Sequence, residues 1–433
     1  MAKFIGIKKG LDINLKGKAS TNVFFNVGES ESYAIIPDHY VGITPKVLVR
    51  EGDNVKSGAP VMCDKNRPEI KFVSPVNGVV SGVNRGEKRK VLSITIKPDE
   101  RVNSERIEMQ DISSYDAGGL KALLLETGLW PYIKQRPYDR VANPSDTPRD
   151  IFVTAYNSAP LAPEVDFLVK SDEGYLQTGL GVLAKLTGGK VYFGVKQGSP
   201  LGSAVKDVEV VEVSGPHPAG NVGVLINNVK PVNKGEVVWT LNAADVFMMG
   251  RMLQEKQFDF SKVIALTGSE FKRCGYTKVI SGCNIGSIVN GLVSEGNVRL
   301  ISGNVLTGTK VGREDYLGAY DSQITAIPEG DDVDEFLGWA TPGLNKFSAS
   351  RTYFSWLNGG KSEYVLDARI RGGKRAMIMS NEYDKVFPMD ILPEYLLKAI
   401  IAFDIDKMEN LGIYEVAPED FALCEFVDTS KIE

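Results

Sequence analysis

The stretch that decides the fold of the first part of the chain reads PKVLVREGDNVKSGAPVM at residues 45–62 and FVSPVNGVVSGVNRGEKRKVLSITI at residues 72–96. In both halves, branched apolar residues alternate with polar ones, as is typical of half-buried β-strands. Gly52-Asp53 and Ser57-Gly58 supply turns in the first half, and Pro75 begins the return strand. The two halves therefore predict a flattened barrel of two facing sheets.

This pairing resembles the two halves of lipoyl- and biotinyl-carrier domains, which form a barrel-sandwich hybrid. A carrier domain presents a lysine at the tip between its halves, and the tip here reads CDKNRP, with Lys65 inside it. Asn66, Arg67, Pro68 and Glu69 make this loop longer than a carrier tip requires. We therefore favour an ordinary solvated lysine over a cofactor attachment site.

Length and composition indicate a folded protein of several domains. A chain of 433 residues predicts three or four of them. The hydrophobic content of 43% and the charged content of 24% exclude disordered and fibrous classes. The net charge of -5 gives no uniform positive field, so we expect no nucleic-acid partner.

The sequence predicts neither an export signal nor a membrane span. The opening MAKFIGIKKG lacks an apolar core followed by a cleavage site. The apolar stretches at 243–253 and 392–403 are far shorter than the ~20 residues that cross a bilayer. No CxxC occurs, which argues against a disulfide framework and a zinc site and fits a reducing, cytoplasmic setting. The cysteines are Cys63, Cys274, Cys283 and Cys424.

We expect a multidomain chain of mixed α/β and α+β class with four units. Strands near 150–155, 190–195 and 208–213 alternate with helices near 175–186 and 242–255, which favours a parallel sheet. Short strands, one helix and glycine turns follow, as in a β-grasp fold of the SLBB type. The predicted units are a barrel-sandwich hybrid at 1–100, a Rossmann-like α/β domain at 101–258, the β-grasp at 259–330, and a linker with a helical C-terminal domain at 331–433.

No catalytic, cofactor-binding or metal-binding motif assembles in the sequence. There is no GxSxG, no HExxH and no cluster of His, Cys and carboxylates at ligand spacing. Gly179 and Gly181 fall inside a predicted helix, and Gly188-Gly189 marks a helix end. Because a phosphate loop needs its glycines between a strand and a helix, we interpret these glycines as structural.

The two histidines differ in their surroundings. His217 lies in SGPHPAG, residues 214–220, directly after a predicted strand of the α/β domain, and ligands of open α/β sheets gather at such strand ends. Pro218 fixes the backbone beside the imidazole, and Gly220 permits close approach. A ligand site and a rigid turn with a hydrogen-bonded histidine are equally compatible with this pattern. His39 follows Pro37-Asp38, and we expect it to be structural or exposed.

A second candidate passage, KFSASRTYFSW at residues 346–356, mixes basic and aromatic side chains. Lys346, Arg351 and Tyr353 could bind a ring-bearing ligand by charge and stacking. Aromatic residues in such a passage are more often part of a core or a subunit interface, so that alternative is favoured.

Five segments in this order resemble the NqrA family, which comprises the A subunits of sodium-translocating NADH:quinone reductases. That family is related to the C subunit of the Rnf complex and to the flavin subunit of complex I. The resemblance covers the whole chain and implies the barrel, Rossmann-like and β-grasp layout. The segments are KKGLDINLKG at 8–17, SPVNGVV at 74–80, SGPHPAG at 214–220, ISGNVLTG at 301–308 and GWATPGLNKFS at 338–348.

The chain departs from those relatives where they hold redox groups. Residues 128–138 read GLWPYIKQRPY, with bulky residues in place of the glycines of a flavin loop. The C-terminal segment keeps Cys424 alone where an iron–sulfur cluster needs four cysteines, and Asp428 stands where family members carry another cysteine. The resemblance thus implies that this chain binds no cofactor. Family chains also continue past Glu433, so we expect a further helix there.

The resemblance implies a peripheral subunit on the cytoplasmic face of a bacterial inner membrane, docked on the membrane-embedded B subunit. In this hypothesis the complex reduces ubiquinone or menaquinone and exports Na⁺, and the isolated chain is not catalytic. The predicted quinone-binding residues are His217, Pro218, Gly220, Lys346, Arg351 and Tyr353. The alternatives are a scaffold subunit that binds no small molecule, and an independent carrier or flavin enzyme.

Overall fold

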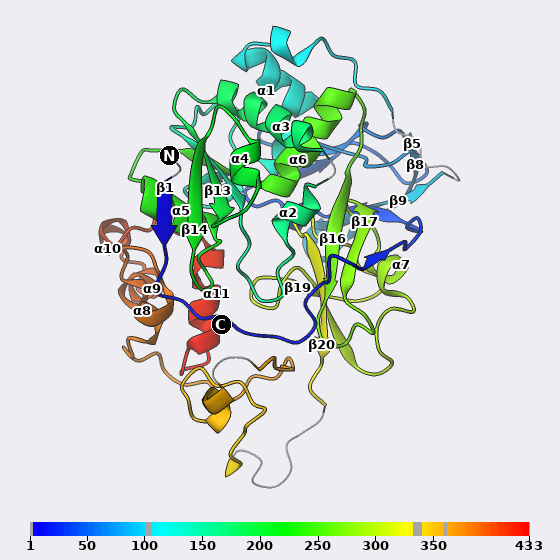
Figure 1. Cartoon of the computed structure of the whole chain (residues 1–433). Coiled ribbons are helices and arrows are strands. Elements are labelled where there is room, and N and C mark those ends of the chain that lie inside the picture. The colour runs from blue at the N-terminus through cyan, green and yellow to red at the C-terminus, as the bar shows by residue number, and fades with distance from the viewer. Residues whose placement is uncertain (1–2, 100–104, 171, 332–339, 359–361, 433) are drawn as a thin grey trace.

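The computed structural model describes residues 3–99, 105–170, 172–331, 340–358 and 362–432. Gly338 and Trp339, which begin the GWATPGLNKFS segment, lie outside the described residues. Figure 1 shows the barrel and the β-grasp sheet on one side of the α/β domain and the C-terminal helices on the other. Among the described residues, no helix has the length and apolar character needed to cross a membrane.

The first unit is the predicted barrel-sandwich hybrid, built from two small antiparallel sheets. One has the order β3-β9-β8-β5 and the other β4-β6-β7. Alternating apolar residues of both halves meet inside, and Val61, Ile70, Ile94 and Ile96 are fully buried. The strands are β3 (Tyr33–Ile35), β4 (Pro45–Val47), β5 (Asn54–Val55), β6 (Pro60–Asp64), β7 (Lys71–Val73), β8 (Gly78–Arg85) and β9 (Val91–Pro98).

The second unit is a seven-stranded sheet with helices on both faces, in the order β1-β14-β13-β12-β15-β10-β11. The first five strands are parallel, and β10 and β11 add an antiparallel edge. The strands are β1 (Lys3–Gly6), β10 (Lys134–Arg136), β11 (Arg140–Val141), β12 (Ile151–Ala155), β13 (Val191–Lys196), β14 (Glu209–Ser214) and β15 (Val238–Asn242). The helices are α1 (Ala117–Glu126), α2 (Val165–Leu168), α3 (Glu173–Leu186), α4 (Leu201–Ala204), α5 (Val222–Val229) and α6 (Ala243–Glu255).

The third unit is a six-stranded sheet in the order β19-β18-β20-β16-β17-β2 with one short helix. Its mixed sheet and single helix agree with the predicted β-grasp, because β16 pairs in parallel with β20 and antiparallel with β17. The elements are β2 (Phe24–Phe25), β16 (Ser261–Thr267), β17 (Gly275–Ile280), α7 (Ile285–Val289), β18 (Val298–Ser302), β19 (Thr309–Val311) and β20 (Gln323–Pro328).

The N-terminal segment joins all three units. Lys3–Gly6 pairs with β14 of the α/β sheet, Phe24–Phe25 pairs with β17 of the β-grasp sheet, and Tyr33–Ile35 enters the barrel. In Figure 1 this blue segment runs from β1 beside β14 across to the β-grasp side. The range 1–100, predicted as one unit, thus contains strands of four different sheets.

The C-terminal part is helical, as predicted, and packs against the α/β sheet. Val386, Phe387, Leu396 and Leu423 form one apolar cluster with Leu225 and other residues of the sheet unit. The elements are a 3₁₀ turn at Phe354–Asn358 and the helices α8 (Glu382–Val386), α9 (Pro393–Ile401), α10 (Ile405–Asn410) and α11 (Pro418–Val427).

Two glycines allow helices α3 and α6 to pack in close contact over the sheet. A Cβ atom added at Gly250 would lie 1.8 Å from the backbone oxygen of Tyr175, and one at Gly179 would lie 2.4 Å from that of Val246. Gly181, one residue beyond Leu180 on α3, has no atom within 4 Å of such a position. Gly179 and Gly181 thus both lie within helix α3, and Gly179 allows α6 to pack closely against it.

We expect Gly250→Ala to lower the free energy of unfolding by about 2 kcal/mol, because backbone cannot move aside as a flexible side chain could. Gly181→Ala is the matched control, since it adds the same methyl group to open space and should raise helix stability by about 0.5–1 kcal/mol. Urea unfolding followed by circular dichroism measures both. Equal effects of the two substitutions would contradict the close contact.

Candidate functional site

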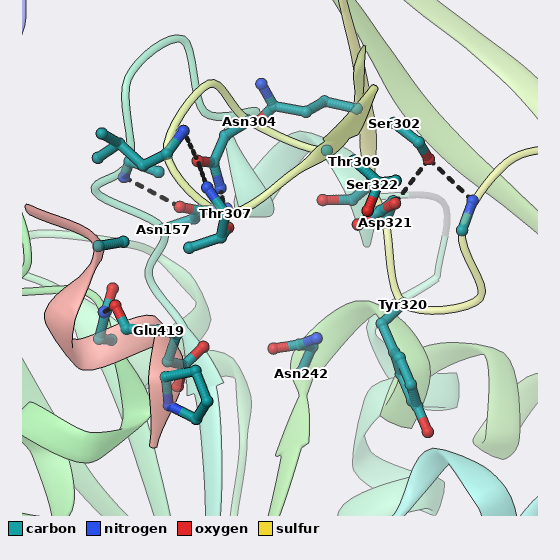
Figure 2. A pocket seen from close by; sticks show the side chains of 18 of the residues that line it. Asn157, Asn242, Ser302, Asn304, Thr307, Thr309, Tyr320, Asp321, Ser322 and Glu419 are labelled. Atoms are coloured by element: carbon teal, nitrogen blue, oxygen red, sulfur yellow. Dashed lines mark hydrogen bonds between the residues drawn. The ribbon is translucent and has the colours of Figure 1, made fainter. Parts of the chain in front are cut away.

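A cavity of about 1110 Å³ lies where the α/β domain, the β-grasp unit and helix α11 meet. Small-molecule pockets typically measure ~300–1,000 Å³, so this space can hold a ring-bearing ligand. Figure 2 shows polar side chains from separate elements around it, among them Asn157, Asn242, Asn304 and Glu419.

The cavity lies at the switch point of the sheet. β13 and β14 follow β12 on one side of it, whereas β15 lies on its other side. At such a point the connections leave to opposite faces and open a crevice at the carboxyl ends of the strands. Thr154 of β12, His217 after β14 and Asn242 of β15 all line the cavity, as the strand-end argument predicted for His217.

His217 is held in a fixed orientation and is 4% exposed. Its Nδ1 lies 3.0 Å from Ser158 Oγ, and that hydroxyl accepts a 2.8 Å hydrogen bond from the Gly220 backbone N–H. Burial lowers the pKa of His217 to about 4, so the imidazole is neutral at physiological pH. The His217–Pro218 peptide bond is cis. Of the predicted quinone-binding residues in this loop, His217 and Gly220 line the cavity and Pro218 does not.

The N-terminal motif supports this loop. The His217 backbone N–H donates to Asp12 Oδ1 at 2.9 Å, and its carbonyl oxygen accepts from the Leu11 N–H at 2.8 Å. A Cβ atom at Gly10 would lie 2.3 Å from the same oxygen, which explains the glycine. The KKGLDINLKG and SGPHPAG segments, about 200 residues apart in sequence, therefore form one structural unit.

The facing wall comes from the ISGNVLTG segment of the β-grasp unit. The Asn304 side-chain oxygen accepts from the N–H groups of Leu306 and Thr307 at 2.8 and 3.0 Å, which shapes the turn after β18. Ser302 Oγ donates to Asp321 Oδ2 at 2.6 Å (Figure 2). Sequence reasoning used this segment only for the family resemblance, and no periodicity marks it as a cavity wall.

A second part of the cavity wall carries buried and half-buried ionisable groups. Burial raises the pKa of Asp245 to about 6 and lowers the pKa of the Lys262 ammonium, which donates to the Ala319 carbonyl oxygen at 3.0 Å. Lys134 Nζ lies 3.1 Å from Asp139 Oδ2. His39, expected to be structural or exposed, also lines the cavity, and burial lowers its pKa. Nothing local in the sequence distinguishes these residues from ordinary surface charges.

Helix α11 places a carboxylate at the N-terminus of helix α5. A Cβ atom at Gly223, in the first turn of α5, would lie 2.4 Å from Asp420 Oδ1. Asp420 is 3% exposed and accepts from Arg136 Nη1 at 3.2 Å. A helix N-terminus after a parallel strand is the usual place for a ligand's phosphate. In this chain that place is filled by the protein's own side chain.

The predicted quinone-binding residues do not come together in one cavity. Lys346, Arg351 and Tyr353 are outside the cavity lining. Lys346 Nζ lies 5.5 Å from the ring centre of Tyr353, and Arg351 is exposed. Phe347 packs against Phe426 of α11, whereas Phe354 and Trp356 of the same passage are about half exposed.

Hydrogen bonds hold the loop at the tip of the barrel, residues 63–68, against the neighbouring backbone. Lys65 is exposed, but its backbone N–H donates to the Thr44 carbonyl oxygen at 2.7 Å. Asp64, which is fully buried, accepts from the Thr44 N–H and from Arg67 Nε at 3.1 and 2.8 Å. This loop folds back on the barrel, which fits the favoured interpretation of Lys65 as a solvated lysine.

The cysteines are free thiols, and the part of the chain that the structure describes holds no group of His, Cys, Asp and Glu arranged for a metal ion. Cys424 is buried in the apolar cluster of the C-terminal helices, and burial raises its thiol pKa strongly. Asp428 is also buried and accepts from the N–H groups of Ser430 and Ile432 at 3.0 and 2.9 Å. Cys424 therefore contributes to packing, and Asp428 contributes hydrogen bonds to the backbone of the C-terminal end.

Three family models match successive parts of the chain. They are the NqrA N-terminal barrel-sandwich hybrid domain at residues 5–99, the NqrA second alpha/beta domain at 115–258 and the NQRA C-terminal domain at 263–313. These matches confirm the predicted fold class.

Full-length relatives agree. The chain is 35% identical to the A subunit of the Na(+)-translocating NADH-quinone reductase of Pasteurella multocida and 37% identical to that of Vibrio vulnificus, in each case over 99% of this chain and 96% of the relative. A NAD⁺-reducing [NiFe]-hydrogenase matches 42% of this chain and 41% of its own with 13% identity and a TM-score of 0.33, a likeness too low to support an inference. The chain therefore belongs to the NqrA family, the A subunits of the Na⁺-translocating NADH-quinone reductase.

Proposed function

We propose that this chain, as the A subunit of a bacterial Na⁺-translocating NADH-quinone reductase, contributes a binding site for the quinone ring. It assembles with the other subunits, chiefly the membrane-embedded B subunit, at the cytoplasmic face of the inner membrane. The names of its full-length relatives support the assembly and the substrate class. The observation that carries the binding role is a buried histidine lining a cavity at the switch point of the sheet.

His217 suits a quinone carbonyl because of its hydrogen bonds. Ser158 Oγ already accepts from the Gly220 N–H, so its own hydrogen is available to His217 Nδ1. In that tautomer Nε2 carries the ring hydrogen and can donate to a carbonyl oxygen. A neutral donor matches a neutral ligand, since a charged imidazolium would need a counter-ion in so buried a place.

The placement of Asp420 supports a cofactor-free chain. A flavin or nicotinamide nucleotide bound at the switch point would direct a phosphate to the N-terminus of α5, where this carboxylate lies beside Gly223. Two anions there would repel each other at low dielectric. In this proposal the electrons reach the quinone from cofactors of partner subunits, and the isolated chain only binds and orients the ring.

The second candidate function is a scaffold subunit that binds no ligand. The exposed apolar surface of the turn at Phe354–Asn358 favours it. Phe354, Trp356 and Leu357 in the turn at Phe354–Asn358 are each about half exposed or more. Large apolar side chains on one turn are typical of a contact with another protein of a complex. Such a contact is compatible with quinone binding elsewhere, so saturable binding of a quinone would exclude only the pure scaffold.

We expect the purified chain to bind a water-soluble ubiquinone analogue with saturable heat in isothermal titration. His217→Asn keeps a polar group near Nδ1 but loses the Nε2 donor, and should weaken binding about ten-fold, the worth of one neutral hydrogen bond. His217→Gln restores a donor near Nε2 and should recover most of the affinity.

Lys346→Ala is the matched control, because Lys346 is outside the cavity lining. A photoreactive quinone should label peptides that contain residues 154–159, 214–222 and 302–309. Labelling confined to 340–356, or equal loss of affinity in His217→Asn and Lys346→Ala, would contradict the proposed site.

We expect His217 to stay neutral down to about pH 5. Because its folded pKa of about 4 lies below the ordinary value of 6.5, the neutral state stabilises the fold above pH 6.5, and that stability is lost as the pH falls toward 4. The loss should reach about 3 kcal/mol. His217→Gln should remove this part of the pH dependence. Ring-labelled histidine gives two NMR signals in this chain, and a His217 midpoint near 6.5 would overturn the argument.

A further inference from the structure

The cavity wall changes character toward the C-terminal helices. Around His217 and Asn304 most of its lining side chains are polar, whereas Met377 and, from the C-terminal helices, Leu397 and Phe421 add apolar side chains, and Leu306 lies beside Asn304. These four side chains are partly buried and pack against the apolar cluster of the C-terminal helices. The apolar wall is therefore supported from behind and does not consist of isolated surface residues.

Helix α11 connects the two kinds of wall. Six of its residues line the cavity from one end of the helix to the other, namely Pro418, Glu419, Phe421, Ala422, Cys424 and Glu425. Over these positions a helix rises about 10 Å. At its start, the Glu419 carbonyl oxygen accepts from the Asn221 side-chain amide at 3.4 Å, close to the polar wall.

Helix α9 carries the apolar wall out to solvent. Its residues Leu396 and Ala399 are buried, while Leu397 and Ile401, four positions apart, share a neighbouring face and both line the cavity. Leu397 is half-buried and Ile401 is 71% exposed. Ile401 therefore forms an apolar mouth at this part of the rim, whereas the exposed lining residues Lys310 and Glu425 are charged; Phe403 and Ile405 follow in the chain and are also exposed.

We propose that this apolar mouth, formed by Leu397 and Ile401 of α9 with Phe421 of α11, is the exit path for the hydrocarbon chain of the bound quinone. The inference rests on the proposed quinone-binding function. Membrane quinones join a carbonyl-bearing ring to a long isoprenoid chain. The polar wall near His217 receives the ring, and the chain lies along the apolar wall, where it buries surface that water would otherwise cover.

The test uses the full-length protein and three ubiquinone analogues with the same ring: one without a side chain, one with a single isoprenoid unit and one with a ten-carbon chain. Each methylene buried contributes about four-fold in affinity. The ten-carbon analogue should therefore bind at least about ten-fold more tightly than the analogue without a chain, as followed by titration calorimetry.

Ile401→Asp should abolish most of that gain and leave the Kd of the chainless analogue within about two-fold of its original value. Ile370→Asp is the matched control, because Ile370 is an exposed isoleucine outside the cavity lining. Both side chains are exposed, so neither substitution should unfold the protein.

Equal affinities for the three analogues, or an equal loss of the gain in Ile401→Asp and Ile370→Asp, would overturn the exit path while leaving ring binding intact. If none of the three analogues binds, the proposed quinone site itself fails, and the exit path fails with it.

Discussion

The position of the C-terminal helix α11 on the α/β sheet, and with it the shape of the cavity, depends on the guanidinium of Arg136. This side chain is 0% exposed and lies at the end of the antiparallel edge strand β10. It donates to the Glu415 carbonyl oxygen and to Asp420 at 3.2 Å each and to Glu419 at 2.9 Å. A buried charge of this kind is costly unless its partners are present, and removal of one partner typically costs about 3–5 kcal/mol. The ion pairs therefore hold α11 in one position on the sheet.

That position determines what the α/β domain can bind. The parallel sheet has the strand order and switch point of nucleotide-binding folds, but α11 brings a carboxylate to the helix N-terminus where such folds bind phosphate. The same helix forms one wall of the cavity. The same docking contact thus places Asp420 at the N-terminus of α5 and forms part of the cavity wall. Cys424, which could suggest a lost metal cluster, is one of the buried contacts that hold α11.

Local sequence patterns predicted most elements of this structure, because strands such as β12 and helices such as α6 carry their own periodicity and end signals. The placement of His217 could also be predicted from the sequence, because its loop follows a strand whose carboxyl end must face the switch point. The polar groups that other units contribute to the cavity could not be predicted from the sequence. Asp245, Lys262 and His39 come together only through contacts between units, and no local pattern encodes those contacts.

The predicted group at residues 346–356 shows that residue type alone does not predict where a segment packs. Lys346 and Tyr353 have the residue types of a ring-binding site, and they do contact each other. Residue type alone could not say that the passage packs over α11 outside the cavity. Likewise, the pairing of Asp12 with the His217 loop depends on β1 joining β14, and the strand itself is only four residues long.

The N-terminal segment has a consequence for synthesis on the ribosome. Lys3 pairs with Val211 and Phe24 pairs with Tyr276. During synthesis the first two strands are therefore unpaired until the ribosome has added about 200 or more residues. At ~5–20 residues per second, that delay is ~10–50 s, during which short apolar strands are unpaired. β1 and β2 therefore find their partners only after β14 and β17 have emerged, whereas all strands of the barrel lie within residues 33–98.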